Sequence, residues 1–251
     1  MRLLIRLEAA RDQKYKTDYH YNIHGFIYNL LKDSEFAHIH NKKGYKFFCF
    51  SNIFPISDMK KGDIKQLLIS SPNSKFVKSL AYKLKIIKRS SSVINIGDMK
   101  FLVRGYKVFN NRLDKENLKL ITATPIIIRI NKDRYKEFGI NPRYEYDYLY
   151  WRKEYPLELF INQLEDNLYK KYEEYNSLKL ERERIINKLR FIKQVSTRLK
   201  IHNNEHIVIG TLWEFWFDNI NDNIIKLLKF GYDCGFGERN SLGFGFINRL
   251  C

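Results

Sequence analysis

GFGERNSLGFG, residues 235–245, is the most specific feature of the sequence. Two Gly-hydrophobic-Gly triplets flank five residues, so four glycines fall within eleven positions. Glycine lets backbone N–H groups approach a phosphate closely, while the apolar residues anchor such a loop to a sheet. The stretch has neither the Gly-Lys-Ser/Thr of a P-loop nor the spacing of a dinucleotide-binding fingerprint. It predicts a phosphate-binding loop of another kind, and the alternative is a glycine-rich turn selected for its shape alone.

The residues that precede and follow this loop predict a regular order of strands and helices in the second half of the chain. The predicted strands cover residues 118–130, 189–201, 206–217 and 243–250, with Asn203-Asn204 as a turn between the second and the third. One helix begins at Pro156. The other is capped by Asp218 or Asn219 and ends at Gly231. Trp213 and Trp216 are predicted to lie in the core.

The first half of the chain predicts the same order. Its strands are the opening RLLIRLEA and residues 45–50, 66–70, 92–96 and 100–109. Its helices follow caps at Thr17-Asp18 and Ser71-Pro72, and each carries an apolar stripe at helical spacing. Both halves therefore read β-α-β-β-α-β, which is the ferredoxin-like unit. We predict an α+β fold of two tandem ferredoxin-like (RRM-like) domains, covering residues 1–112 and 118–251.

The charge of the chain is unevenly distributed. Its 251 residues contain 45 Lys and Arg against 28 Asp and Glu, a net charge of +17. Residues 1–125 hold 24 basic and 10 acidic side chains (24 − 10 = +14), whereas residues 126–251 hold 21 and 18 (21 − 18 = +3). This asymmetry predicts a polyanionic partner, nucleic acid above all, for the first half. The alternatives are an anionic membrane surface and a basic surface that is only solvated.

The cysteines and the apolar runs indicate the compartment. Cys49, Cys234 and Cys251 are odd in number and lack CxxC spacing, which is typical of a reducing environment. The longest apolar runs, such as residues 125–128, are far shorter than the roughly 20 residues of a membrane span. We expect a soluble, cytoplasmic protein without a membrane partner.

With its glycine loop and its two ferredoxin-like units, the sequence resembles the CRISPR-associated endoribonucleases of the RAMP superfamily (repeat-associated mysterious proteins). The resemblance covers essentially the whole chain. It implies cleavage of precursor transcripts in the CRISPR repeat by 2′-OH attack, which leaves a 2′,3′-cyclic phosphate and a 5′-OH. It also implies that the glycine loop binds RNA, through Gly235, Gly237, Arg239, Gly243 and Gly245.

The expected catalytic residues lie in two stretches of the N-terminal domain, GFIYNLL (25–31) and IHNKKGYKFFCFS (39–51). The family's layout has a Tyr on the first helix, a His just after it and a Lys a few residues on. Matched residue by residue, these positions are Tyr28, His40 and Lys46. His38 is a second candidate, because the two histidines project to the same side if this segment is extended. Histidine suits a general base or acid at neutral pH, and lysine stabilises charge that develops on the phosphorane.

Two further groups of residues have candidate roles. Arg190, Arg198 and Lys200 form a basic face of one predicted strand that could bind the RNA backbone. His20 and His24 could ligate zinc with His38 or His40, but no HExxH motif or Cys pair accompanies them. We therefore expect no metal and no cofactor.

The sequence leaves two functions to be weighed. The first is a metal-independent endoribonuclease that processes CRISPR repeat RNA. The second is a non-catalytic RNA-binding subunit of a CRISPR interference complex. The HIH tripeptide (residues 38–40) with Lys46 downstream favours the enzyme. Other CRISPR interference proteins and a second copy of the chain, forming a homodimer, are further candidate partners. A generic RRM-type binder is disfavoured because the aromatic RNP signature is absent.

Overall fold

The computed structural model describes residues 1–144, 146–201, 204–218 and 220–250, which form two compact units. The N-terminal unit contains Met1–Arg112, Arg198–His206 and Asn240–Gly243, and the C-terminal unit contains the rest. Two short segments of the predicted C-terminal domain therefore belong to the N-terminal unit. The turn residue Asn203, the alternative cap Asn219 and Cys251 lie outside the described residues.

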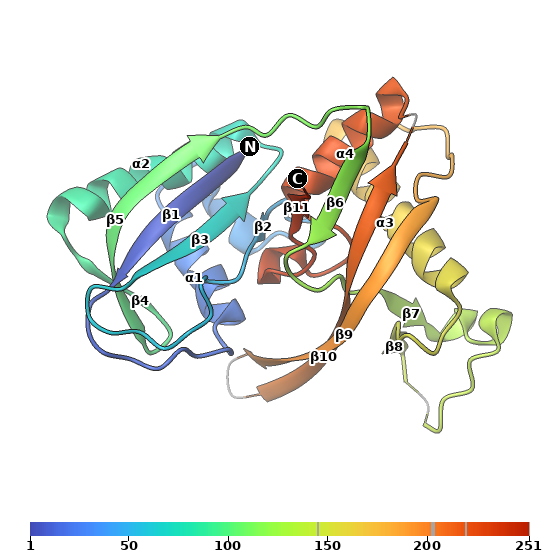
Figure 1. The fold of residues 1–251 in the computed structure, drawn as a ribbon, viewed down its shortest axis with the longest axis horizontal. Coiled ribbons are helices and arrows are strands. Elements are labelled where there is room, and N and C mark those ends of the chain that lie inside the picture. The colour runs from blue at the N-terminus through green and yellow to red at the C-terminus, as the bar shows by residue number, and fades with distance from the viewer. Residues whose placement is uncertain (145, 202–203, 219, 251) are drawn as a thin grey trace. The chain divides into compact units, whose positions relative to one another are not determined.

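The N-terminal unit is a ferredoxin-like fold with one extra edge strand (Figure 1). Its sheet has the order β2-β3-β1-β5-β4, and every strand pair is antiparallel. The elements are β1 (Arg2–Ala9), α1 (His20–Leu31), η1 (Ala37–His40), β2 (Cys49–Phe50), β3 (Ile64–Ser70), α2 (Ser74–Ser90), β4 (Val93–Ile96) and β5 (Met99–Phe109), with η4 (Asn240–Leu242) from the later chain.

Apolar periodicity explains why these residues form these elements. Leu3, Ile5 and Leu7 alternate along β1 and are fully buried, as expected for one face of a strand. The predicted apolar stripes of both helices are buried too. In α1 they include Ile23 and Ile27. In α2 the buried stripe consists of Phe76, Val77, Leu80, Ala81 and Leu84. The core of this unit thus lies between the sheet and the two helices.

Three local predictions for this unit are wrong. Residues 45–50 form a strand only at Cys49–Phe50, because Phe47 has a left-handed φ of 50° that interrupts an extended chain. The N-cap of helix α1 is Tyr19, which makes no side-chain capping hydrogen bond, and the predicted cap at Thr17-Asp18 is wrong. Helix α2 is capped by Asn73, and not by Ser71-Pro72, because the Asn73 side chain accepts from the amides of Lys75 and Phe76.

The C-terminal unit repeats the ferredoxin-like topology with the sheet order β11-β6-β10-β9 (Figure 1). A two-stranded ribbon, β7-β8, is inserted between its first strand and first helix. The elements are β6 (Leu118–Thr122), β7 (Arg129–Asn131), η2 (Lys132–Arg134), η3 (Lys136–Phe138), β8 (Tyr148–Tyr150), α3 (Leu157–Asn176), β9 (Lys188–Ile201), β10 (Asn204–Phe217), α4 (Asp222–Cys234) and β11 (Ile247–Arg249). The predicted α+β class with two ferredoxin-like units is confirmed.

The expected continuous strand over residues 118–130 is broken in two. It leaves the sheet after Thr122 and resumes as β7, because its middle part supports the glycine loop. The carbonyl of Pro125 accepts from the Gly245 amide, and the carbonyl of Ile127 accepts from the Glu238 amide.

The ends of α4 also differ from the prediction. Its N-cap is Asn221 and not Asp218. Gly231 lies inside the helix, and Gly235 ends it. A Cβ at Gly231 would come within 2.6 Å of Leu168 on α3. Gly231 therefore permits close packing of two helices.

The core of the C-terminal unit is aromatic. Trp213 is 2% exposed and stacks on Phe160 with the ring centroids 4.5 Å apart, which confirms its predicted place in the core. Trp216 is half-buried. None of the helices in the described ranges combines the length and the apolar character that crossing a membrane requires.

The Asn73 cap can be tested by substitution. Asn73→Ala removes an acceptor for two amides at the start of α2, so the free energy of unfolding should fall by about 1 kcal/mol. For a chain of this size that corresponds to about 2–4 °C in Tm, measured by thermal circular dichroism. Asn73→Ser keeps an acceptor and serves as the control. Equal melting of the Ala and Ser variants would contradict the capping role.

Candidate active site

Tyr28 on α1 is the centre of a cluster of polar and aromatic side chains in the N-terminal unit. The Lys46 ammonium donates to the Tyr28 hydroxyl over 2.7 Å, and its Nζ lies 5.1 Å from the ring centroid. The His40 ring packs edge-on against Tyr28 with the centroids 4.9 Å apart. The structure therefore brings together the three residues that the family layout predicted, although the chain separates Tyr28 from Lys46 by 18 positions.

The loop between His40 and Lys46 turns back on itself. Gly44 has a φ of +84°, a conformation that favours glycine, and the chain reverses there. The Lys46 Nζ consequently donates to the His40 carbonyl as well, over 3.2 Å. Phe48, which is fully buried, lies 6.3 Å from the Tyr28 ring and anchors the far end of the loop. The Lys46 ammonium therefore lies against the backbone of residue 40.

His40 is exposed and has one ring nitrogen available. Its Nδ1 lies 2.8 Å from Asn41 Oδ1, and because that oxygen only accepts, Nδ1 carries a proton. In the neutral ring the lone pair is then on Nε2. An exposed imidazole with this tautomer can take a proton from a ligand.

His38 does not share a side with His40, so the expectation of one extended segment is wrong. Both histidines lie in the 3-10 helix η1, in which successive residues turn by about 120°. Residues two apart therefore project about 120° from each other. The His38 Nδ1 donates to the Glu35 carbonyl over 2.8 Å, and its ring is exposed.

Burial changes the acid–base properties of the cluster. It raises the pKa of the Tyr28 phenol, which therefore stays protonated at neutral pH. It lowers the pKa of the Lys46 ammonium, because the charged form is less well solvated there. Since Lys46 donates to the Tyr28 oxygen, the phenolic proton points elsewhere and can be donated to a ligand.

His24 is a member of this cluster that sequence reasoning missed. Its ring lies 4.2 Å from that of Tyr28, and His24 precedes Tyr28 by one turn of α1. Burial, followed by the charges of Lys46 and His40, lowers the pKa of His24 to about 4. The i, i+4 spacing from His24 to Tyr28 was the available signal.

His20, the other helix histidine, belongs elsewhere. It is buried, and its Nδ1 contacts the Leu242 carbonyl at 2.9 Å. Across the part of the chain that the structure describes, no group of three or more His, Cys, Asp or Glu is arranged to hold a metal ion.

Backbone hydrogen bonds, within the loop and to neighbouring segments, hold the glycine loop. The amides of Gly235, Gly243 and Gly245 donate to the carbonyls of Gly231, Asn240 and Pro125. These three amides are therefore engaged within the protein. Phe236 and Phe244 are fully buried, which confirms that the apolar positions anchor the loop. RNA binding by the loop stays a prediction.

The loop leaves no room for a side chain at Gly237, and the buried Lys171 binds two of its carbonyls. Gly237 has a φ of +67°, and a Cβ there would lie 2.6 Å from the Ile127 carbonyl oxygen. The Lys171 ammonium of α3 donates to the carbonyls of Gly235 and Gly237 over 2.6 and 3.0 Å. A larger residue at Gly237 would therefore disturb folding, and valine there is no clean probe of RNA contact.

The basic residues predicted to bind RNA have different environments. Arg239 is half-buried and its guanidinium contacts the Tyr148 hydroxyl at 3.4 Å. Arg190 forms a bidentate ion pair with Glu214 at 2.7 and 2.9 Å. Arg198 and Lys200 are exposed on the same face of β9, as the alternation predicted.

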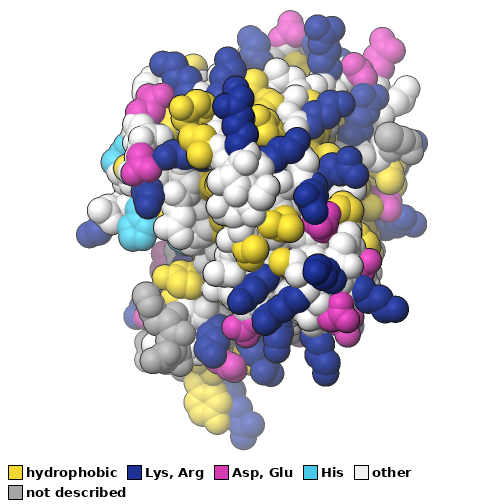
Figure 2. Space-filling model, turned by 90° about the vertical axis from the view of Figure 1, so that its left-hand side faces the viewer, with side chains coloured by type: hydrophobic (Ala, Val, Ile, Leu, Met, Phe, Trp, Pro, Cys, Tyr) yellow, Lys and Arg dark blue, Asp and Glu magenta, His cyan; other side chains and the backbone are white. Residues whose placement is uncertain are grey.

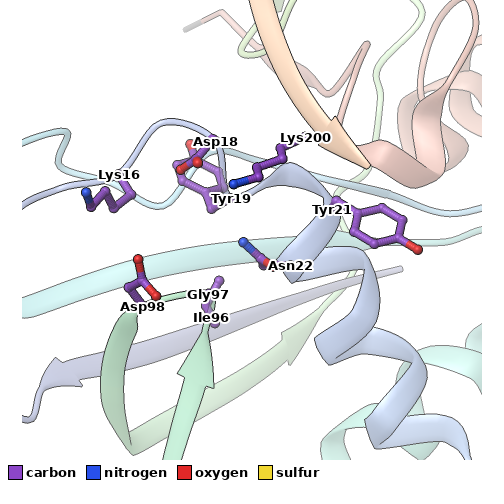
Figure 3. Close-up of a pocket in the computed structure, with 9 residues that line it drawn as sticks. All are labelled: Lys16, Asp18, Tyr19, Tyr21, Asn22, Ile96, Gly97, Asp98 and Lys200. Carbon is purple, nitrogen blue, oxygen red and sulfur yellow. The ribbon is translucent and has the colours of Figure 1, made fainter. Parts of the chain in front are cut away.

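Lys200 lines a pocket of about 340 Å³ within the N-terminal unit (Figure 3). Figure 3 shows residues that precede and begin α1 on one side and the β4–β5 turn on the other. The lining mixes charges of both signs: Lys16, Asp18, Asp98 and Lys200.

Comparison with known proteins identifies the family. Residues 107–249 match the family model described as "CRISPR associated protein Cas6, C-terminal". Over 263 residues the chain is 36% identical to CRISPR-associated endoribonuclease Cas6 2 of Methanocaldococcus jannaschii, with 100% of both chains covered. The chain belongs to the Cas6 family. The resemblance inferred from the glycine loop is confirmed.

Two further comparisons agree with the Cas6 assignment. The chain is 27% identical over 256 residues to the CRISPR-associated endoribonuclease Cas6 of Haloferax mediterranei, which covers 99% of this chain and 93% of that one. The solved structure of a RAMP protein that binds different RNA substrates superposes with a TM-score of 0.75, at 23% identity and with 100% of both chains covered. That likeness shows a shared fold.

The lowered pKa of His24 predicts a pH dependence of stability. The folded state keeps His24 neutral down to about pH 4, whereas the unfolded chain takes up a proton near pH 6.5. The free energy of unfolding should therefore fall as the pH drops from about 6.5 toward 4. His24→Gln should fall less steeply over this range. NMR titration of the His24 ring measures its pKa directly, and a midpoint near 6.5 would contradict the burial argument.

Proposed function

We propose that this chain is a metal-independent endoribonuclease that binds CRISPR repeat RNA and cleaves the precursor transcript with the Tyr28 cluster. The observation that carries the proposal is the convergence of Lys46 and His40 on Tyr28. A proton acceptor, a cation and a neutral donor lie within one small surface. The endoribonuclease names of the Cas6 relatives support the reaction class.

In the proposed reaction His40 is the general base. Its Nε2 takes the proton of the 2′-OH next to the scissile phosphate, and the 2′-oxygen attacks the phosphorus. The P–O5′ bond breaks, the leaving 5′-oxygen takes a proton from water, and the His40 imidazolium releases the proton that it gained. The products are a 2′,3′-cyclic phosphate and a 5′-OH. His38 is the second candidate for proton transfer, with its ring oriented by the Glu35 carbonyl.

Lys46 and Tyr28 stabilise the transition state in this proposal. The ammonium offers a positive charge to the phosphorane oxygens, where negative charge accumulates during the attack. The phenol, kept protonated by its raised pKa, donates to another phosphate oxygen. Their mutual hydrogen bond fixes both groups before the substrate arrives.

Basic side chains of both units hold the RNA in this proposal. The candidates are Arg239 of the glycine loop, in the C-terminal unit, and the exposed Arg198 and Lys200 of β9, which belong to the N-terminal unit. Arg190 contributes less than the sequence suggested, because Glu214 already occupies its guanidinium. The solved RAMP protein of the same fold binds different RNA substrates, which supports RNA as the ligand.

The setting of the proposed function is the cytoplasm, where the precursor transcript is made. Other CRISPR interference proteins and a second copy of the chain stay predicted partners. The competing function, a non-catalytic RNA-binding subunit, would keep the RNA affinity and lack cleavage. The experiments below separate the two.

The first experiment tests the chemistry. Labelled repeat RNA incubated with the protein in EDTA should be cut at a discrete site, because the proposed groups need no metal. RNA with a single 2′-deoxy nucleotide at that site should bind with similar affinity and stay intact, because the attacking oxygen is missing. Strict dependence on magnesium, or comparable cutting of the deoxy RNA, would contradict 2′-OH attack. Binding without any cut would favour the non-catalytic subunit.

The second experiment tests the assignment of the base. His40→Ala should slow single-turnover cleavage by about 10²- to 10⁴-fold, which is the usual contribution of a positioned acid or base. RNA affinity should change far less, since the group acts on a reacting proton. His38→Ala should cost about tenfold, and exposed His206→Ala on β10 is the matched control. Normal cutting by both the His38 and the His40 variants would rule out the histidine mechanism.

A further inference from the structure

Helix α2 of the N-terminal unit has an unusual solvent-exposed face. Its 17 residues include six Lys or Arg and no Asp or Glu. Seven-residue spacing places Lys75, Tyr82 and Arg89 along one line of the helix, with Lys78 and Lys85 along the adjacent line. We call these five residues the α2 stripe. Figure 2 looks at the side of the molecule where α2 lies in Figure 1 and shows more Lys and Arg than carboxylate side chains.

Within the described ranges, no acidic side chain pairs with the cations of the α2 stripe. In the described parts of the chain, Lys83 pairs with Asp33 over 2.7 Å, whereas Lys75, Lys78, Lys85 and Arg89 are exposed and form no ion pair. Four unpaired cations on one helix face repel each other unless an anion is bound. Pairing inside the protein therefore does not explain them.

An exposed aromatic ring lies between these cations. Tyr82 is 63% exposed, and its neighbour Ile86 on the same face is 47% exposed. Basic side chains with an aromatic ring between them are the combination that binds single-stranded nucleic acid, because phosphates pair with the cations and a base stacks on the ring. A membrane surface fits less well, since the apolar face of α2 is buried in the core of the unit.

The α2 stripe begins next to the loop of the candidate active site. Phe76, in the first turn of α2, stacks on Phe48 with the ring centroids 5.2 Å apart, and Phe48 contacts Tyr28. Ser71, just before the helix, donates to the Phe47 carbonyl over 2.7 Å. From Lys75 to Arg89 the stripe then extends over 14 residues, or about 21 Å.

We propose that the α2 stripe binds a single-stranded segment of the precursor RNA that continues from the cleavage site, with Tyr82 stacked on a base. This proposal rests on the proposed function and adds to it a second RNA surface, outside the Tyr28 cluster and the glycine loop. It makes the affinity depend on RNA beyond the cut site. Four phosphates are paired by four cations, without readout of sequence.

The test compares three RNAs. One is the repeat, and the other two are the repeat extended by about 15 unstructured nucleotides, either 5′ or 3′ of the cut site. All three carry the 2′-deoxy block so that binding is measured without cleavage. The wild-type protein should bind one extended version at least about fivefold more tightly than the repeat, since one stacked base contributes that much.

Two variants remove the proposed contacts. A quadruple variant replaces Lys75, Lys78, Lys85 and Arg89 by Gln, and Tyr82→Ala removes the ring while Tyr82→Phe keeps it. The matched control removes four exposed lysines elsewhere, so that its net charge falls equally: Lys60, Lys61, Lys136 and Lys226. Circular dichroism checks that every variant is folded, because none of these changes touches the core face of α2.

The quadruple variant should lose the advantage of the extended RNA, and the control should keep it. Four phosphate contacts contribute about −2.8 to the slope of log K against log[salt]. Between 50 and 200 mM salt, the affinity of wild type for the extended RNA should therefore fall about 50-fold more than that of the quadruple variant. Tyr82→Ala should weaken binding about fivefold or more, and Tyr82→Phe should not.

Two outcomes would overturn the proposal: equal affinity of wild type for all three RNAs, or equal losses in the quadruple variant and the control. Cleavage of the unblocked repeat by the wild-type protein is measured separately. A wild type that cuts the repeat but shows no gain from either extension refutes the α2 stripe alone. A wild type that does not cut refutes the proposed function.

Discussion

The hydrogen bond from the Lys46 ammonium to the Tyr28 hydroxyl is the interaction on which the candidate site depends. It joins a helix of the rigid core to a loop that has little apolar anchorage of its own between Ile39 and Phe48. Because the same ammonium also donates to the His40 carbonyl, one side chain closes the loop at both ends. The position of the imidazole then follows from its contact with the Tyr28 ring.

This arrangement has consequences for charge. Burial favours the uncharged forms of both the Lys46 ammonium and the Tyr28 phenol. The pKa of Lys46 is therefore lower than that of an exposed lysine, and the pKa of Tyr28 is higher than that of an exposed tyrosine. Burial also lowers the pKa of His24, so its imidazole is uncharged at neutral pH. Among the residues that the structure describes, no carboxylate contacts the cluster, and the acceptor for His40 is the neutral Asn41 side chain. A phosphate group is the ligand that such a site suits.

Much of the fold could be predicted from periodicity, because burial of alternate or helically spaced apolar residues determines both sheets and all four long helices. The failures occurred where a local signal competes with tertiary contacts. YKFFCF is rich in strand formers, but Phe47 takes a left-handed conformation while Lys42 packs over its ring. The run through Pro125 is apolar enough for one strand, but its carbonyls are needed to hold the glycine loop.

The site was predictable to the extent that the family layout specifies it. Tyr28, His40 and Lys46 come together as the matched motif required. The different orientations of His38 and His40 were not predictable, since a short 3-10 helix leaves no periodic pattern in the sequence. His24 was missed for another reason. Its i, i+4 spacing to Tyr28 was a local signal, but the approach of Lys46 and His40 that completes the cluster is a long-range contact, which the local sequence does not encode.

The most direct test of the central claim is a double-mutant cycle between Tyr28→Phe and Lys46→Met, with single-turnover cleavage of repeat RNA as the readout. If the hydrogen bond makes the two residues act as one unit, the double variant should be no more than about twofold slower than the slower single variant. Tyr28→Phe keeps the ring against His40, so the cycle isolates the hydroxyl. Rate losses that multiply in the double variant would mean that Tyr28 and Lys46 act independently, and would contradict the account.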